Sequence, residues 1–306
     1  MTGAPLRAPV LWATGLGPVR RFVTGSRLGR RVALRFVAGE RLEEGMAAAR
    51  ALDRQGIRAM LDHLGENVAS AEQASGAADG YVLALKRIHE AEGLDCNIAV
   101  KLTQLGLDHS LDLCLENTER VLAAARGTLV MIDMESSEYV DGTLEVLRRL
   151  RERHEGVGVA LQSYLYRTAE DVFSLPEDAP VRLVKGAYLE PPTVAHQRRA
   201  GVDRAFANLF ATLVSRGHPV HVATHDPRLL AGACRLVEGR GLSWERVELQ
   251  MLYGIRHDLQ RWYVDRGYPV RAYVPYGAQW YPYLTRRLAE RPANVGFVVR
   301  SLFKGR

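Results

Sequence analysis

Short apolar runs alternate with longer amphipathic stretches along most of this chain. Eight runs rich in apolar and β-branched residues predict strands, at residues 58–63, 96–102, 128–132, 157–161, 181–184, 219–223, 246–251 and 269–274. The stretches between them have apolar residues at helical spacing and predict helices, among them residues 78–92, 111–125, 142–153, 202–216 and 228–238. Alternating strands and helices form parallel sheets, and eight such units close into a barrel. The pattern therefore predicts an α/β protein with a (β/α)8 TIM-barrel fold.

The remaining segments extend this single barrel. Residues 40–55 have apolar side chains at helical spacing, which predicts a helix before the first strand. The helical signal is short at 167–176 and mixed at 254–266, so the predicted boundaries there are approximate. No low-complexity linker or shift of composition divides the chain after residue 40. We therefore expect one domain over residues 40–306, preceded by an N-terminal arm at residues 1–39.

Positive charge is concentrated in this arm. The net formal charge is +6, yet residues 1–39 contain seven arginines and no aspartate or glutamate, which leaves the rest of the chain close to neutral. Such an arm can contact anionic lipid or nucleic acid, or dock on the protein itself, and an acid-free, arginine-rich start is also a feature of transit peptides. The near-neutral body argues against a protein whose main function is to bind nucleic acid.

Composition restricts the class of protein further. The chain has 306 residues, of which 47% are apolar and 25% charged, as is typical of a globular protein. We expect no membrane-spanning helix, because no run of 18 apolar residues occurs, and no signal peptide, because the start lacks a compact apolar core and a cleavage site. Three cysteines without CxxC spacing favour a reducing cytoplasm and argue against a structural zinc site.

Polar residues stand where the predicted strands end. Lys101, Gln162 and Gln250 lie inside or at the edge of apolar runs, where a buried polar group needs a partner. Other polar or ionisable residues stand at the remaining exits: Glu66, Asn67, Asp133, Glu135, Lys185, Thr224, His225, Asp226 and Tyr273. Because active sites of such barrels gather at the C-terminal ends of the strands, these residues predict a large polar ligand at that end.

An adjacent pair of arginines, Arg286 and Arg287, lies on a helix predicted after the last strand. Neighbouring residues on a helix point about 100° apart, so such a pair rarely serves one surface row of ion pairs. If the helix lies across a pocket, the two guanidinium groups can converge on one carboxylate. The alternative is an ordinary basic helix face, in which Glu290 is an intrahelical partner of both arginines.

Three other groups of residues each have two interpretations. Asp133 orients Lys101 toward a substrate, or the two residues form a buried ion pair that only joins adjacent strands. Arg182 and Lys185 both contact an electron-rich cofactor, or one faces the barrel and the other faces solvent. Residues 224–226 bind a ligand, or they only cap the loop that follows their strand.

Other classes of function stay open at this point. One is a Schiff-base barrel enzyme with Lys185 or Lys101 as the nucleophile. Another is a protein that binds lipid or nucleic acid through residues 1–39 without catalysis. A metal hydrolase could use four residues of which only one is a histidine: Asp133, Glu135, His225 and Asp226. The sequence contains no dinucleotide fingerprint after a strand, no P-loop, no nucleophile elbow and no HExxH motif.

Seven segments carry a more specific signal through their order and spacing. They are Asp133-Met134-Glu135, Gln162-Ser163-Tyr164-Leu165, Arg182-Leu183-Val184-Lys185-Gly186-Ala187-Tyr188, Ala223-Thr224-His225, Leu249-Gln250-Met251-Leu252-Tyr253-Gly254, Tyr273-Val274-Pro275-Tyr276-Gly277 and Arg286-Arg287-Leu288-Ala289-Glu290. Together they closely resemble the proline dehydrogenase family, specifically its small single-function bacterial members. The resemblance covers roughly residues 32–305.

The resemblance implies a distorted (β/α)8 barrel that binds FAD, with an N-terminal helical extension and a C-terminal helix over the barrel mouth. It also implies oxidation of L-proline to Δ1-pyrroline-5-carboxylate, the first step of proline degradation, by hydride transfer from proline C5 to flavin N5. Electrons would pass to a membrane quinone, and the product to a separate pyrroline-5-carboxylate dehydrogenase, since the chain is too short for the second domain of bifunctional relatives. We expect a cytoplasmic protein, peripheral on the inner face of the cell membrane, without bound metal or nucleic acid.

The resemblance also implies roles for particular residues. Asp133 and Arg182 are the expected catalytic residues, with Arg182 near the flavin N5 edge. The expected substrate-binding residues are Arg286 and Arg287 as a carboxylate clamp assisted by Lys101, with Tyr273 and Leu252 against the pyrrolidine ring. The expected FAD-binding residues are Met134, Gln162, Arg182, Lys185, Gly186, Ala187, Tyr188, Thr224, His225 and Glu290.

One flavin contact and the acceptor of the amine proton are not assigned by the resemblance. Many relatives have tryptophan where Leu189 follows Tyr188, which puts one local flavin contact in doubt. The reaction needs a neutral amine, and the residue that accepts the amine proton stays open.

Overall fold

The computed structural model describes residue 21, residues 24–25 and residues 33–290 of the chain. Within the predicted basic arm, the structure therefore describes only residues 21, 24–25 and 33–39, and the side chain of Glu290 also lies outside the described residues.

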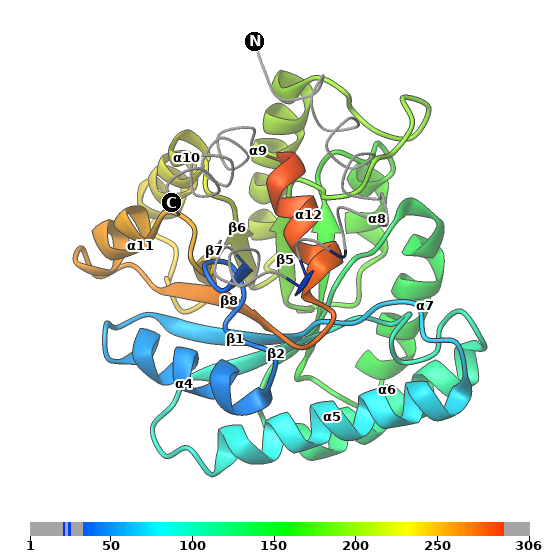
Figure 1. Ribbon diagram of the computed structural model, residues 1–306. Coiled ribbons are helices and arrows are strands. Elements are labelled where there is room, and N and C mark those ends of the chain that lie inside the picture. The colour runs from blue at the N-terminus through cyan, green and yellow to red at the C-terminus, as the bar shows by residue number, and fades with distance from the viewer. Residues whose placement is uncertain (1–20, 22–23, 26–32, 291–306) are drawn as a thin grey trace.

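Eight parallel strands form a closed barrel in the described part of the chain (Figure 1). They follow chain order around the barrel, and the last strand pairs with the first. Their bounds are β1 Arg58–His63, β2 Cys96–Val100, β3 Val130–Ile132, β4 Val157–Gln162, β5 Val181–Val184, β6 Val220–Ala223, β7 Val247–Leu252 and β8 Val270–Tyr276. The predicted barrel is confirmed, because each apolar run became a strand that is covered by helices.

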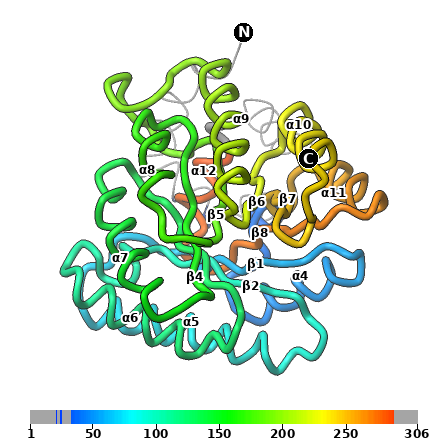
Figure 2. The backbone as a smooth tube through the Cα atoms, turned by 180° about the vertical axis from the view of Figure 1, so that it is seen from behind, coloured from blue at the N-terminus to red at the C-terminus, as the bar shows by residue number. Residues whose placement is uncertain are grey.

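The helices that connect the strands lie around the outside of the barrel (Figure 2). They are α5 Ala71–His89, α6 Leu111–Ala125, α7 Val140–Arg151, α8 Thr168–Ser174, α9 Arg199–Ser215, α10 Pro227–Gly239 and α11 His257–Val264, with a short 3-10 turn, η1, at Ser137–Tyr139. Helix α5 begins earlier than its apolar pattern predicts because Ser70 caps it, its hydroxyl accepting a hydrogen bond from the Gln73 amide. None of the helices in the described residues is long and apolar enough to span a bilayer.

Two helices, α4 and α12, make the barrel irregular. The helix α4 (Leu42–Asp53) contacts β1 and β8, so it covers the stretch of barrel wall where a regular eighth helix would lie. The helix α12 (Trp280–Glu290) instead packs Tyr283 and Leu284 with Phe36 and Leu64. Because Leu64 directly follows β1, α12 lies across the C-terminal ends of the strands, as Figure 1 shows. The sharp exit from β8 uses Gly277, whose φ of +131° favours glycine.

A network of buried charges fills one end of the barrel interior. Arg271 donates to Glu248 at 2.8 Å and forms an ion pair with Asp95 at 2.9 Å. The side-chain amide of Gln250 contacts Glu248 at 2.9 Å and the His221 ring at 2.8 Å, and burial lowers the pKa of His221 to about 4. The amide nitrogen of Gln250 thus has partners within this network, whereas its buried Oε1 has none in the described part of the chain, so the expectation that Gln250 serves a ligand stays a prediction.

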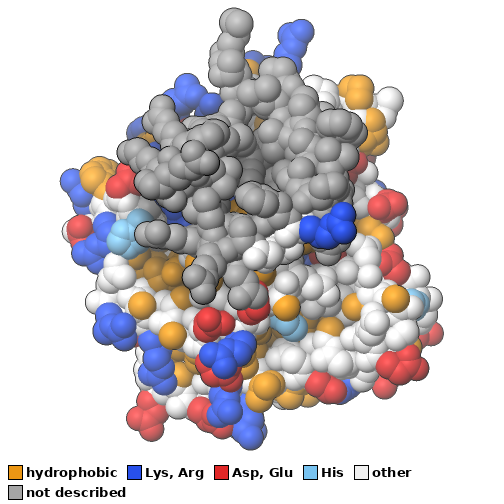
Figure 3. Space-filling model, in the orientation of Figure 1, with side chains coloured by type: hydrophobic (Ala, Val, Ile, Leu, Met, Phe, Trp, Pro, Cys, Tyr) orange, Lys and Arg blue, Asp and Glu red, His pale blue; other side chains and the backbone are white. Residues whose placement is uncertain are grey.

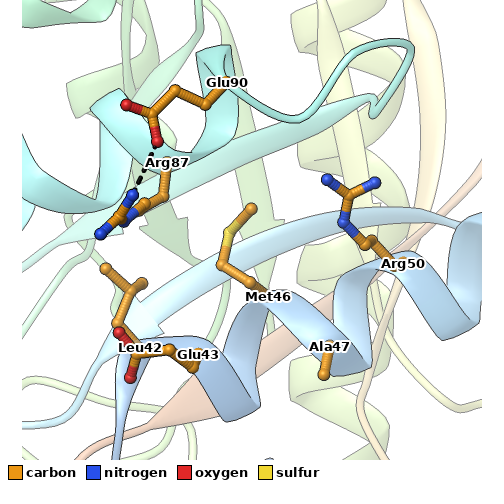
Figure 4. A pocket seen from close by; sticks show the side chains of 7 residues that line it. All are labelled: Leu42, Glu43, Met46, Ala47, Arg50, Arg87 and Glu90. Carbon is orange, nitrogen blue, oxygen red and sulfur yellow. Dashed lines mark hydrogen bonds and ion pairs between the residues drawn. The ribbon is translucent and has the colours of Figure 1, made fainter.

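Charged side chains of both signs are interspersed over the part of the surface that Figure 3 colours. A hollow of about 420 Å³ lies on this outer layer, between α4 and the end of α5, and is lined by Leu42, Glu43, Met46, Ala47, Arg50, Arg87 and Glu90 (Figure 4). Arg87 and Glu90 pair with each other at its rim, at 2.8 Å. The hollow contains none of the polar residues at the strand ends, which lie at the mouth of the barrel.

Candidate active site

Two buried carboxylates surround Lys101 at the end of β2. Its ammonium donates to Asp62 Oδ1 at 2.6 Å and lies 3.6 Å from Asp133 Oδ2. All three side chains are buried. Burial alone would lower the pKa of Lys101, but Asp62, Tyr273 and Asp133 together outweigh it and raise the pKa well above its usual value. A protonated Lys101 is a hydrogen-bond donor and a fixed positive charge, and it is a poor Schiff-base nucleophile.

Asp133 connects four strands of the barrel. Its Oδ1 accepts a hydrogen bond from the Arg182 guanidinium, and its Oδ2 accepts one from the Tyr273 hydroxyl at 2.6 Å. The Arg182 guanidinium carbon also lies 4.8 Å from the centre of the Tyr273 ring. With Lys101, which directly follows β2, these contacts join residues of β5 and β8 to the residue that follows β3. Asp133 therefore organises two cations and a phenol, which is more than the simple pair with Lys101 considered from sequence.

The charged residues Lys101, Asp133 and Arg182 lie next to a group of apolar side chains, which we call the apolar floor. Tyr273 packs with Met60, Ala99 and Met131, and Leu252 packs against the same group. This cluster is separate from the larger core between the strands and the outer helices. An apolar surface below a group of fixed charges suits a small ligand that has one apolar part and one charged part.

Arg182 and Lys185 lie on different sides of β5. Arg182 is buried in the interior, whereas Lys185 reaches Asp203 at 2.5 Å and Asp226 at 3.2 Å. Asp226 also caps α10, because its carboxylate accepts a hydrogen bond from the Arg228 amide at 3.1 Å. The structure thus supports the loop-cap interpretation for Asp226 and separates the two cations.

Several buried polar atoms near the strand ends have no partner in the described part of the chain. The Gln162 side chain donates to the backbone carbonyls of Met134 and Glu135, at 3.0 and 2.9 Å, which leaves its buried Oε1 without a partner. Arg182 Nε, on the neighbouring strand, is also buried without a partner. Such atoms are costly unless a ligand satisfies them. One is an acceptor and one a donor, and a flavin ring has both donor and acceptor groups at its edge, so these residues fit it.

Two further loops at this end have restricted geometry. Gly186 has a φ of +121°, and a β-carbon there would lie 2.3 Å from the Tyr164 ring, so only glycine fits. His225 is held by the Leu252 amide, which donates to its Nε2 at 2.9 Å. The close approach of Tyr164 explains the glycine in the Lys185-Gly186-Ala187-Tyr188 segment. The His225 contact joins the loop after β6 to the end of β7.

Helix α12 brings its arginines to the barrel mouth. The two terminal nitrogens of Arg286 donate to the two carboxylate oxygens of Glu66, at 2.9 and 2.6 Å. Its guanidinium carbon lies 5.7 Å from the centre of the Tyr188 ring. The Arg287 guanidinium carbon lies 5.2 Å from the centre of the Tyr283 ring, one turn earlier on the same helix. The helix thus lies across the site as the clamp hypothesis requires, although one arginine already holds a protein carboxylate.

Two residues of this cluster were not assigned from the sequence. Asp62 is an isolated acid within an apolar strand, the same signal that drew attention to Lys101. Glu66 was noted at the exit of β1, but nothing local indicated that it would meet a helix 220 residues later. Among the described residues, no group of three or more His, Cys, Asp or Glu side chains is placed to hold a metal ion.

A parallel barrel with buried ionisable groups and unpartnered polar atoms at its C-terminal end has the architecture of a TIM-barrel enzyme. The family model described as proline dehydrogenase matches residues 45–300. The chain therefore belongs to the proline dehydrogenase family.

Individual relatives agree with this assignment. The chain is 42% identical to a proline dehydrogenase of Deinococcus radiodurans, over 90% of this chain and 91% of that one. It is 39% identical to proline dehydrogenase 1 of Bacillus subtilis, over 92% of each chain. Among solved structures it resembles proline utilization A of Bdellovibrio bacteriovorus inactivated by N-propargylglycine, with a TM-score of 0.80 and 26% identity. That match covers 92% of this chain and 36% of the longer protein.

These findings confirm the family and the fold predicted from sequence. The protein is an oxidoreductase that oxidises proline, the first step of proline catabolism, and its family implies a flavin cofactor. Membership of this family excludes the alternative functions considered from the sequence, namely a Schiff-base enzyme, a metal hydrolase and a non-catalytic binding protein. The residue roles remain predictions, and the geometry described above bears on each of them.

Proposed function

We propose that this proline dehydrogenase uses FAD to oxidise L-proline to Δ1-pyrroline-5-carboxylate and delivers the electrons to a membrane quinone. The observation that carries the proposal is the cluster of Lys101, Asp133 and Arg182 above the apolar floor at Tyr273. FAD, when bound, supplies the acceptor for the hydride that leaves proline C5. The protein then has to bind both molecules, orient them and provide the electrostatic environment.

The proposed cofactor residues lie along the ends of β3 to β6. Gln162 Oε1 and Arg182 Nε are the buried atoms that a flavin ring would satisfy. A positive charge at Arg182 favours transfer of negative charge into the ring. The remaining proposed FAD contacts are Met134, Lys185, Gly186, Ala187, Tyr188, Thr224, His225 and Glu290.

The proposed substrate site lies between the floor and α12. Lys101, Arg286 and Arg287 are the proposed carboxylate ligands, and Tyr273 and Leu252 the proposed ring contacts. Glu66 takes two of the five N–H donors of Arg286 and leaves three for another acceptor. Because Glu66 fixes the guanidinium before substrate arrives, less side-chain entropy is lost on binding.

Asp133 is proposed to position the catalytic groups. Its two oxygens fix Arg182 and the Tyr273 hydroxyl, and its charge balances the two cations. Fixed positions of these groups would orient a bound proline relative to the cofactor, and such orientation lowers the entropic cost of the reaction.

The absorbance spectrum of the purified protein tests this proposal directly. We expect flavin bands near about 370 and 450 nm, which lose intensity when L-proline is added without oxygen. An acyclic amino acid such as L-alanine, at the same concentration, should leave the bands unchanged. Bands that persist with proline would contradict the substrate, and a protein with no bands after incubation with FAD would contradict the cofactor.

The cellular context is also part of the proposal. We infer a cytoplasmic enzyme that meets its quinone at the inner face of the cell membrane, with the seven arginines of residues 1–39 attracted to anionic lipid. A separate pyrroline-5-carboxylate dehydrogenase is the proposed consumer of the product.

Deletion of residues 2–31 tests the role of the arm. We expect the shortened enzyme to keep its proline turnover with a soluble dye acceptor but to sediment less with vesicles that contain anionic lipid. Neutral vesicles are the control, because charge attraction contributes roughly 1 kcal/mol per basic residue near an anionic surface. Undiminished binding to anionic vesicles would show that another surface contacts the membrane.

A further inference from the structure

A buried glutamate joins the loops that follow β1, β2 and β3. Glu135 Oε1 accepts a hydrogen bond from the Thr103 amide at 3.0 Å, and its Oε2 accepts one from the Thr103 hydroxyl at 2.6 Å. The same hydroxyl oxygen accepts a hydrogen bond from the Asn67 amide at 3.2 Å. Because a hydroxyl has one proton, its donation to Glu135 leaves its lone pairs for Asn67. We call this chain of contacts the Glu135–Thr103–Asn67 relay.

The relay ends at a turn with a defined geometry. Asn67 has a φ of +50°, in the left-handed region that few residues other than glycine and asparagine adopt. Its side-chain amide donates to Asp108 at 2.9 Å, and Asp108 also accepts a hydrogen bond from the Tyr139 hydroxyl at 2.6 Å. The preceding residue is Glu66, which holds Arg286. The position of this turn therefore sets the position of the carboxylate opposite Arg286.

We propose that Glu135 is a positioning residue for the substrate carboxylate: through Thr103 it fixes the Asn67 turn and thereby keeps Glu66 on Arg286. The inference rests on the proposed role of Arg286 and Arg287 in binding that carboxylate. The hydrogen bonds of the relay connect Glu135 to the turn that carries Glu66. Loss of the relay should weaken binding of the carboxylate and leave the reacting atoms in place.

The relay also makes binding sensitive to pH. Burial raises the pKa of Glu135 to about 7, although the hydrogen bonds from Thr103 oppose the shift. The titratable groups that interact with it come from every neighbouring loop and helix: Glu66, Lys101, Cys114, Tyr139 and Tyr188. Above pH 7 the carboxylate accepts from Thr103, and below it the protonated group does so less strongly. Carboxylate affinity should therefore fall as the pH drops through 7.

The test uses the FAD-loaded enzyme and cyclopentanecarboxylate, which has the shape of proline but no amine to titrate. Its inhibition constant is measured from pH 6 to 8.5 in four variants: Thr103→Val, Thr103→Ser, Glu135→Gln and, as a control, Glu138→Gln in the same loop. At pH 8.5 we expect Thr103→Val to raise the constant about tenfold, the equivalent of one hydrogen bond to a charged group. Thr103→Ser, which keeps the hydroxyl, and Glu138→Gln, an exposed residue, should stay within about twofold of the parent enzyme.

The pH profile separates positioning from a general loss of structure. In the parent enzyme the inhibition constant should rise as pH falls through 7, and in Glu135→Gln it should stay at one raised value throughout. The turnover number for proline should be nearly unchanged in Thr103→Val, whereas a damaged fold would lower it.

Two results would overturn the proposal in distinguishable ways. Equal inhibition constants in Thr103→Val, Thr103→Ser and the parent enzyme, with a raised constant in Arg287→Met, would reject the relay and leave the carboxylate site intact. An unchanged constant in Arg287→Met as well would reject the carboxylate site on which the relay depends.

Discussion

Replacing Arg287 with methionine is expected to raise the KM for proline by roughly 30- to 1000-fold while FAD remains bound. The loss corresponds to one charge-assisted pair with a carboxylate, which contributes about 2–4 kcal/mol in a partly buried site. Methionine keeps the length and apolar character of the side chain, so its packing near the Tyr283 ring is largely preserved. Steady-state kinetics with a dye acceptor gives the KM, and the flavin absorbance of the purified variant gives the bound cofactor.

Arg266→Met is the matched control for this experiment. Arg266 also lies over an aromatic ring, 3.8 Å from the centre of Trp262, but beyond α11 and away from the strand ends. It should leave the KM for proline within about twofold of the parent value. A normal KM in Arg287→Met would contradict the arginine clamp, and loss of flavin would indicate that Arg287 acts on the cofactor instead.

Replacing Asp133 with alanine is expected to lower the rate of flavin reduction by proline by about 100- to 1000-fold. The variant loses the acceptor for Arg182 and for the Tyr273 hydroxyl, so both groups can leave the geometry that serves the reaction. Asp133→Asn keeps the size of the side chain but not its charge, and should show the same direction of effect. Anaerobic stopped-flow absorbance measures the rate, and thermal unfolding measures the stability.

The melting temperature of Asp133→Ala and Asp133→Asn should change much less than their turnover number. Lys101 keeps its hydrogen bond to Asp62 at 2.6 Å, so one of the two cations retains a carboxylate partner. Asp171→Ala is the control, because Asp171 is also a buried carboxylate with an arginine partner, Arg167 at 3.0 Å, but on α8 outside the site. A melting temperature that collapses in Asp133→Ala, with normal turnover in the fraction still folded, would show that Asp133 only stabilises the barrel.

Local sequence signals determined the regular elements well. The predicted strands at 58–63 and 181–184 coincide with β1 and β5, and the predicted helix at 111–125 coincides with α6. Side chains return to the same face every two residues in a strand and every 3.6 residues in a helix, so the spacing of apolar residues indicates which element forms. The second strand ends at Val100, two residues before its predicted end, because the chain turns at once and the Leu105 amide bonds to the Lys101 and Leu102 carbonyls.

The sequence also indicated which polar residues belong to the candidate site, but not which residues they contact. Lys101 and Asp133 were identified as buried charges because each interrupts or ends an apolar run. Their closest partners, Asp62 for Lys101 and Arg182 for Asp133, come from other strands. Gln250 gave the same signal as Gln162, and its amide nitrogen joins the charge network around Glu248, which the sequence did not indicate.

The eightfold alternation of strands and helices and the family can be recognised from the residues in chain order, because both depend on local periodicity and on ordered motifs. Which charges meet follows from the folded barrel: Lys101 meets Asp62, Asp133 meets Arg182, and Arg286 meets Glu66. Barrel closure brings strand ends together that are far apart in the chain, and α12 then crosses them. Coulomb energies and hydrogen bonds depend on these distances in space, which no local pattern of residues specifies.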